Sequence, residues 1–239
     1  EALGPVAGIE TKEVITYDVG TVDFAPLFSK AQASGADFIY QVSSVSSQVM
    51  SSQYVKLQVP MAMTGVNVSA LGLEYWEDTG GAGGGISTLS PVPSVGFELD
   101  PESQKFVDTY QAKYTSRPVM PHFNGFNAYW GLKQAMAAAE AAGGFSDAAK
   151  WAKEMEKQDI TLEKDGKLWL RYAFWGNDEV EEVTGRTYPH NARFDLTAPY
   201  EDAQPSMVVI QWKEDGQVGV VYPPEYATTT FEVPSWVKK

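Results

Sequence analysis

The pattern of apolar and polar positions between Gly20 and Ser44 predicts a helix followed by a buried strand. Apolar residues recur at the spacing of a helix with one buried face, directly after residue types that favour helix N-termini: Phe24, Leu27, Phe28 and Ala31. Gly35 ends this helix, and the apolar run Phe38–Val42 is typical of a strand that is covered on both faces. Together with the serine-rich loop that follows, these elements form half of a parallel α/β unit.

Similar patterns predict the other elements. Strands are expected at Lys12–Tyr17, Pro60–Thr64 and Ile86–Leu89, and helices at Ser47–Leu57, Ala70–Glu77, after Asp100-Pro101, at Asn124–Ala142 and at Asp147–Lys157, the last capped by Ser146. Two further strands, Met207–Trp212 and Val218–Tyr222, are separated by Glu214-Asp215-Gly216 and predict a hairpin. The chain is therefore expected to belong to the α/β class.

Composition and charge exclude several functions. The 239 residues are 44% hydrophobic and 21% charged, as in ordinary globular proteins. The net charge of −13 disfavours nucleic acid as a partner. With no cysteine and with histidines only at His122 and His190, the chain predicts neither a thiol nucleophile nor a metal site. We expect no cofactor.

Several segments, in order, resemble one known family. They are GTVDFAPLFSKAQASGADFIYQVSS (20–44), PMAMTGVNVSA (60–70), YWEDTGGAGGG (75–85), FNAYWGLKQAMAAAEAAGG (126–144) and MVVIQWKEDGQVGVVYPP (207–224). This series is similar to the C-terminal portion of a type I periplasmic binding protein of the branched-chain amino acid (leucine/isoleucine/valine-binding) family, the substrate-binding proteins of ABC transporters.

The resemblance implies a two-lobe α/β fold with a parallel sheet in each lobe. Residues 1–84 would form the second lobe, 85–205 part of the first lobe, and 206–239 a return to the second lobe and a C-terminal tail. The N-terminal part of the first lobe would be missing from this chain. We therefore expect about 130–170 further residues, on the same or another polypeptide, because two lobes of typical domain size require them.

The serine loop after Phe38–Val42 is the first candidate binding site. Ligands of open parallel sheets bind beyond the carboxyl ends of the strands. The hydroxyls of Ser43 and Ser44, with nearby backbone N–H groups, can hold a carboxylate or amide there. The alternative is a plain strand-to-helix loop in which a serine caps the next helix.

A second loop, Thr64-Gly65-Val66-Asn67, supplies Gly65 and Asn67 as candidates. In the amino-acid-binding relatives this loop carries an acidic side chain that pairs with the α-ammonium of the ligand, whereas here Asn67, or Val66 in the alternative register, stands in its place. An amide cannot offset a desolvated ammonium as a carboxylate does. The alternative role for Asn67 is to shape a turn or cap a helix.

His122 and Phe123 are candidates from the other lobe, because they precede the predicted helix that begins at Asn124. Family members place a pocket side chain near this point. Phe123 could equally be a core residue.

Taken together, we expect an extracytoplasmic solute-binding receptor of an ABC importer, periplasmic or extracellular, either free or as a cell-surface lipoprotein. It would trap a small polar or amphipathic metabolite by hinge closure without enzymatic activity. Its partners would be this solute, the permease subunits and the remaining N-terminal part. Two alternatives stay open: a ligand-sensing regulatory protein of the same fold, and an α/β enzyme with unrecognised catalytic carboxylates.

Overall fold

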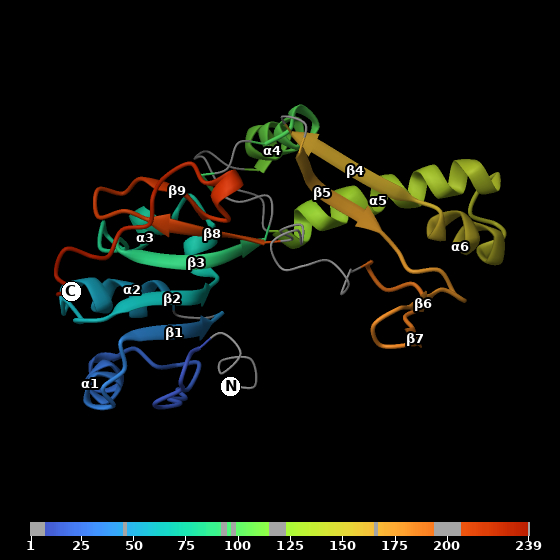
Figure 1. Ribbon diagram of the computed structural model, residues 1–239. Helices are drawn as coiled ribbons and strands as arrows, with labels where there is room; N and C mark the ends of the chain where they lie inside the picture. The colour runs from blue at the N-terminus through green and yellow to red at the C-terminus, as the bar shows by residue number, and fades with distance from the viewer. Residues whose placement is uncertain are drawn as a thin grey trace. The chain divides into compact units, whose positions relative to one another are not determined.

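The computed structural model describes residues 8–44, 47–91, 95–96, 99–114, 123–164, 167–193 and 207–238 (Figure 1). They fall into two compact units. The first takes its described residues from Glu1–Glu98, Phe106–Met120 and Met207–Lys239, and the second from Leu99–Lys105 and Pro121–Ser206. The chain thus leaves the first unit and returns to it for its last segment.

A five-stranded sheet organises the first unit, in the order β1-β2-β3-β8-β9. The strands are β1 (Phe38–Ser43), β2 (Ala62–Asn67), β3 (Ile86–Pro91), β8 (Met207–Trp212) and β9 (Val218–Tyr222). The first three run parallel, whereas β8 is antiparallel to both β3 and β9. The predicted hairpin is confirmed: Gly216 has φ +85° and its N–H donates to the Lys213 carbonyl at 3.0 Å.

Helices cover one face of this sheet. They are α1 (Ala25–Ala33), α2 (Ser47–Lys56) and α3 (Tyr75–Asp78), together with the 3-10 turn η2 (Ser69–Leu71). A second 3-10 turn, η3 (Pro224–Tyr226), follows β9. α1 and α2 bury their apolar stripes against β2 and β3 in one core cluster: Phe24, Phe28, Met50, Tyr54, Val59, Met61, Met63 and Ile86. The helical periodicity of the sequence therefore predicted this face correctly.

The expectation that Phe38–Val42 is covered on both faces is wrong. Three alternate residues of β1 are exposed: Phe38 by 37%, Tyr40 by 58% and Val42 by 71%. β1 is the edge strand of the sheet, and the helices that pack on it lie on its other face. An apolar run alone does not reveal whether a second layer is present.

The predicted strand at Lys12–Tyr17 is also absent from the structure. No strand among the described residues pairs with this segment, although Tyr17 packs edge-on against Phe24 with ring centroids 5.3 Å apart. β-branched residues supply strand propensity, but a strand also needs a neighbour with which its backbone can bond.

The second unit combines helices with short hairpins. Its elements are α5 (Phe123–Ala142), α6 (Ala148–Glu156), β4 (Asp159–Lys164), β5 (Lys167–Ala173), β6 (Val180–Glu181) and β7 (Arg186–Thr187). β4 pairs with β5 and β6 with β7, both antiparallel. The Trp151 indole N–H donates to the Ala135 carbonyl at 3.1 Å and so ties α6 to α5.

Two helix starts illustrate how capping was predicted. α4 (Pro101–Tyr114), which has residues in both units, is capped as expected by Asp100, whose carboxylate accepts from the Glu102 and Ser103 N–H groups. The cap of α6 is Asp147, which accepts from the Lys150 N–H at 3.0 Å, and not Ser146. A carboxylate at the N-cap also interacts favourably with the helix dipole.

β3 pairs with β2 and β8 in the sheet of the first unit, although the sequence analysis placed the change of lobe before it, at residues 84–85. The assignment of 1–84, 85–205 and 206–239 to lobes otherwise stays a prediction. Among the described residues, no helix has both the length and the apolar character needed to cross a membrane.

Candidate functional site

Four of the predicted site residues meet in the first unit, at or near the carboxyl ends of β1 and β2. Ser43 and Asn67 are paired across the two parallel strands, and Gly65 is paired with Gln41. The N–H of Val68 donates to the Ser43 carbonyl at 3.1 Å and so joins the residue after β2 to the last residue of β1. The two loops singled out in the sequence therefore leave the sheet side by side.

The side chain of Asn67 is fully buried and bonded on both of its polar atoms. Nδ2 donates to Ser51 Oγ at 3.0 Å and to Gln41 Oε1 at 3.4 Å, while Oδ1 accepts from the Ala70 N–H at 3.2 Å. Its own N–H donates to Thr88 Oγ1 at 2.9 Å. Asn67 thus caps the turn that follows β2 and fastens it to α2, the structural role considered in the sequence analysis.

Gly65 allows β1 and β2 to approach each other. Its φ is +120°, and a Cβ at this position would lie 2.1 Å from the Gln41 carbonyl oxygen. Only glycine fits such a contact without moving backbone. Gly65 therefore shapes the strands below the edge.

Ser44, rather than Ser43, presents an accessible side chain at this edge. Ser43 is only 3% exposed and Ser44 is exposed. The side chain of Ser43 points to the covered face of the sheet, because it alternates with the exposed Val42. Ser44 is thus the hydroxyl that a solute in water can reach.

A chain of hydrogen bonds beside these residues was not predicted from the sequence. Ser47 Oγ donates to Ser69 Oγ at 2.7 Å, and Ser69 Oγ donates to Gln48 Oε1 at 2.9 Å. These groups come from the first turn of α2 and from η2, so they join the same two loops. Gln48 and Ser69 could have been found by asking which polar residues stand next to the loop residues on the following helices.

An acidic side chain also lies in the segment after β2, where the sequence analysis singled out none. Glu74 curls over Gly72, at which a Cβ would meet the Glu74 carboxylate, and one buried oxygen of this carboxylate has no hydrogen-bond partner among the described residues. Among all of the residues that the structure describes, no cluster of three or more His, Asp or Glu side chains is arranged to hold a metal ion.

The candidates from the other predicted lobe are described only in part. His122 lies outside the described residues, and α5 begins at Phe123, of which the backbone alone is described. Their approach to Ser44 or Asn67 stays a prediction.

Comparison with known proteins gives one family. The profile of the periplasmic binding protein family matches residues 4–216. The "Leu/Ile/Val-binding protein homolog 7" of Brucella suis biovar 1 (strain 1330) is 26% identical over 246 residues, covering 95% of this chain and 51% of that protein. The chain spans about half the length of the curated relatives that it matches.

Solved structures share the fold at low identity. A solute-binding protein of an ABC transporter from R. palustris, in complex with benzoate, has a TM-score of 0.59 at 15% identity. The superposition covers 98% of this chain and 54% of that protein. The substrate-binding protein LivJ from Streptococcus pneumoniae, in complex with isoleucine, has a TM-score of 0.51 at 17% identity. This superposition covers 87% of this chain and 51% of LivJ. The type I periplasmic binding protein fold expected from the sequence is therefore confirmed.

Proposed function

Because this chain belongs to the periplasmic binding protein family, we propose that it forms part of a solute-binding receptor of an ABC importer. The observation that supports this role is the edge formed by β1, β2 and their loops. Hydroxyl and amide groups gather there at the carboxyl ends of parallel strands, where open α/β sheets bind ligands. The receptor would work outside the cytoplasm and deliver its solute to permease subunits.

The solute we propose is a small amphipathic molecule that carries a carboxylate or an amide. Hydroxyl and N–H groups can bind a carboxylate without a charge of their own, and the accessible Ser44 provides such a group. The similar proteins from S. pneumoniae and R. palustris hold isoleucine and benzoate, and each of these ligands joins a carboxylate to an apolar body.

Within this proposal the residues have different roles. Ser44 contacts the solute, and the bonded pair Ser47 and Ser69 fixes the two loops beside it. Asn67 and Gly65 hold the loops from below, since one is buried and bonded and the other permits the strand contact. Ser43 contributes its backbone carbonyl to the same edge, and His122 with Phe123 would contact the solute from the other lobe.

Solute capture would follow from closure of two lobes. A ligand that contacts both lobes binds the closed form more tightly and shifts an existing equilibrium toward it. No covalent step is needed.

The test is a thermal-shift screen of the complete natural polypeptide with leucine, isoleucine, benzoate and benzamide, with glucose as the control. A ligand at 100 times its dissociation constant stabilises a protein by about 2.7 kcal/mol. We expect a clear rise in melting temperature with at least one carboxylate or amide and recovery of the compound unchanged. Chemical conversion of the compound, or a response to glucose alone, would contradict the proposal.

A further inference from the structure

The side-chain amide of Gln48 joins the two loops of the candidate site. Gln48 is the second residue of α2 and is half-buried. Its Oε1 accepts a hydrogen bond from Ser69 Oγ of η2 at 2.9 Å. Its Nε2 has no hydrogen-bond partner among the described residues, and it is not one of the buried polar atoms that lack a partner. One end of the amide is therefore bonded to the protein, and the other is open to solvent.

The direction of the hydrogen bonds beside Gln48 follows from Ser47. Ser47 is fully buried, and among the described residues its Oγ meets the Ser69 Oγ at 2.7 Å and the Ser69 N–H at 3.3 Å. The N–H is itself a donor, so Ser69 Oγ is the acceptor that the Ser47 hydroxyl proton can reach. A buried hydroxyl proton without an acceptor would destabilise the fold. The chain of hydroxyls therefore runs from Ser47 to Ser69.

This direction fixes how the amide of Gln48 is turned. Ser69 Oγ accepts the proton of Ser47 and still has its own proton to donate. The oxygen of the Gln48 amide can accept that proton, whereas its nitrogen cannot. The oxygen and nitrogen of an amide are assigned from such a network, and here the network turns Oε1 toward Ser69. The two N–H groups of Nε2 therefore face outward.

We propose that Gln48 contacts the solute and that its outward N–H groups select a carboxylate or carbonyl oxygen. This inference rests on the receptor function proposed above. The hydroxyl of Ser44 can donate or accept, so it does not distinguish a solute group that accepts from one that donates. The Nε2 group of Gln48 can only donate. A solute that turned an ammonium group toward Gln48 would find no acceptor there, so Gln48 determines which kind of group binds beside Ser44.

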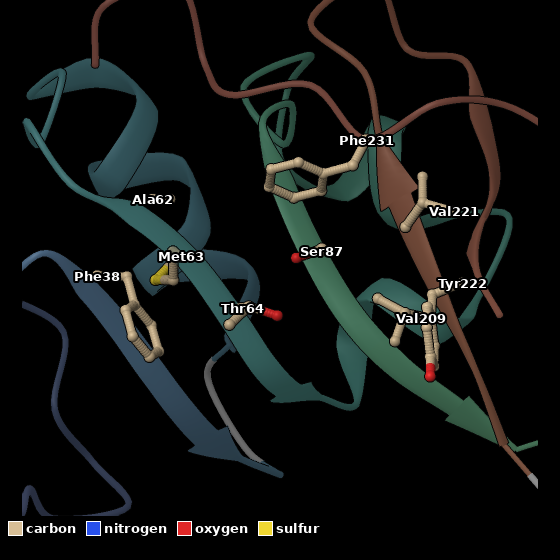
Figure 2. A pocket seen from close by; sticks show the side chains of 9 residues that line it. All are labelled: Phe38, Ala62, Met63, Thr64, Ser87, Val209, Val221, Tyr222 and Phe231. Atoms are coloured by element: carbon tan, nitrogen blue, oxygen red, sulfur yellow. The ribbon is translucent and has the colours of Figure 1, made fainter. Parts of the chain in front are cut away.

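A hollow elsewhere on the same sheet suits a carboxylate less well. It has a volume of about 480 Å³ and lies on the face of the sheet shown in Figure 2. Thr64, Ser87 and Tyr222 supply hydroxyl groups there, and the other lining residues, such as Phe38 and Phe231, are apolar. No amide or charged side chain is among the residues that line it. A carboxylate gives up strong hydrogen bonds to water when it is buried, so it is better matched by the donors at Gln48.

Calorimetric titration of the complete natural polypeptide with benzoate, benzamide, leucine and isoleucine tests this role. Gln48→Glu keeps an acceptor for the Ser69 hydroxyl but replaces the outward amino group with a carboxylate oxygen. We expect it to weaken the binding of carboxylates tenfold or more. Benzamide should lose less, because it can turn its own amino group toward the new oxygen. Gln48→Met, which removes the donor without adding a charge, should also weaken the carboxylates.

The matched control is Gln32→Glu, which adds the same charge at an exposed position of α1, before the amino end of β1. It should leave every affinity unchanged. The inference is overturned if Gln48→Met binds the carboxylates as tightly as the wild type, or if Gln32→Glu weakens them as much as Gln48→Glu does. If none of the four compounds binds to the wild type, the proposed class of solute is wrong instead.

The orientation of the Gln48 amide can be measured without any solute. Its side-chain amino signals in nitrogen-15 NMR spectra are identified by their absence from Gln48→Glu. Both N–H groups should exchange with water as fast as those of the exposed Gln32. Slow exchange of one of them would show that Nε2 bonds to Ser69, and this result would overturn the inference even where the receptor function holds.

Discussion

Asn67 donates a hydrogen bond from Nδ2 to Ser51 Oγ at 3.0 Å and so connects the end of β2 to the middle of α2. Both residues are fully buried. If Asn67 left this position to follow a ligand, Ser51 Oγ, Gln41 Oε1 and the Ala70 N–H would each lose a hydrogen-bond partner. Its amide is therefore part of the scaffold on which the accessible serines stand.

Replacement of Asn67 by alanine should therefore destabilise the fold. A buried polar group that is left without a hydrogen bond destabilises a fold by about 1–3 kcal/mol, so the free energy of unfolding should fall by that amount. Urea denaturation measures it, with the exposed Asn177→Ala as the control. If Asn67→Ala and Asn177→Ala unfold at the same urea concentration, the buried network has no structural role.

Gly65→Ala should be more harmful than a helical glycine substitution. A Cβ at position 65 would lie 2.1 Å from a backbone oxygen, and φ is +120°. Backbone strain of this kind costs about 1–3 kcal/mol before the steric clash is added. The control is Gly131→Ala in α5, where a Cβ meets nothing within 4 Å and should stabilise by about 0.5–1 kcal/mol. Thermal unfolding that ranks the two variants in the opposite order would contradict this account.

Ser44→Ala should weaken solute binding without affecting stability. The exposed hydroxyl is the accessible group at the edge, so its loss should raise the dissociation constant tenfold or more, about 1.4 kcal/mol. Calorimetric titration with the solute identified in the thermal-shift screen provides the measurement. Ser29→Ala on α1 is the matched exposed serine. Equal affinity in both variants would remove Ser44 from the site.

Capping of α6 gives a further test. Asp147→Ala removes the acceptor of the Lys150 N–H and should reduce the free energy of unfolding by about 1 kcal/mol. Ser146→Ala should change it little, because the exposed Ser146 is not the N-cap residue. Guanidinium denaturation of the two variants distinguishes them, and a larger loss for Ser146→Ala would show that the cap is misassigned.

The ion pair between Arg193 and Glu179 should add a small pH dependence. Two hydrogen bonds from Arg193 lower the pKa of the Glu179 carboxyl below its ordinary value. The stabilisation is therefore present above the ordinary carboxyl pKa of about 4.3 and is lost as the pH falls through the lower folded value. Both side chains are about one third exposed or more, at 32% and 38%, so the effect is modest.

Arg193→Gln should flatten the fall of melting temperature between neutral pH and about pH 3, where carboxylates titrate. Arg171→Gln is a useful comparison, because Arg171 similarly lowers the pKa of Asp159. The account would fail if the melting temperatures of wild type and Arg193→Gln fell in parallel.

Local chemistry made most of the first unit predictable. Helix α2 and the hairpin β8–β9 begin and end within a residue of their expected bounds, since apolar periodicity and the turn at Gly216 are local signals. The exposure of β1 was not predictable, because a strand's second face depends on what packs there. The missing strand at Lys12–Tyr17 was not predictable either, because a strand needs a neighbouring strand, and strand propensity does not show whether one is present.

The candidate site was predictable as a place more than as a set of contacts. Ser43 and Asn67 are indeed neighbours, because parallel strands end together at one edge. The sequence could not reveal that Asn67 is bonded on every side, or that Ser47 and Ser69 meet, since these contacts join residues far apart along the chain.

The pairing of β3 with β8 has a consequence for synthesis on the ribosome. β8 and β9 complete the sheet, yet they are translated only after all of residues 92–206. Until then, β3 has a neighbour on one side only, and the Trp212 indole that donates to the Ala70 carbonyl at 2.9 Å has not yet been made. The sheet of the first unit therefore stays incomplete while the residues of the second unit are synthesised.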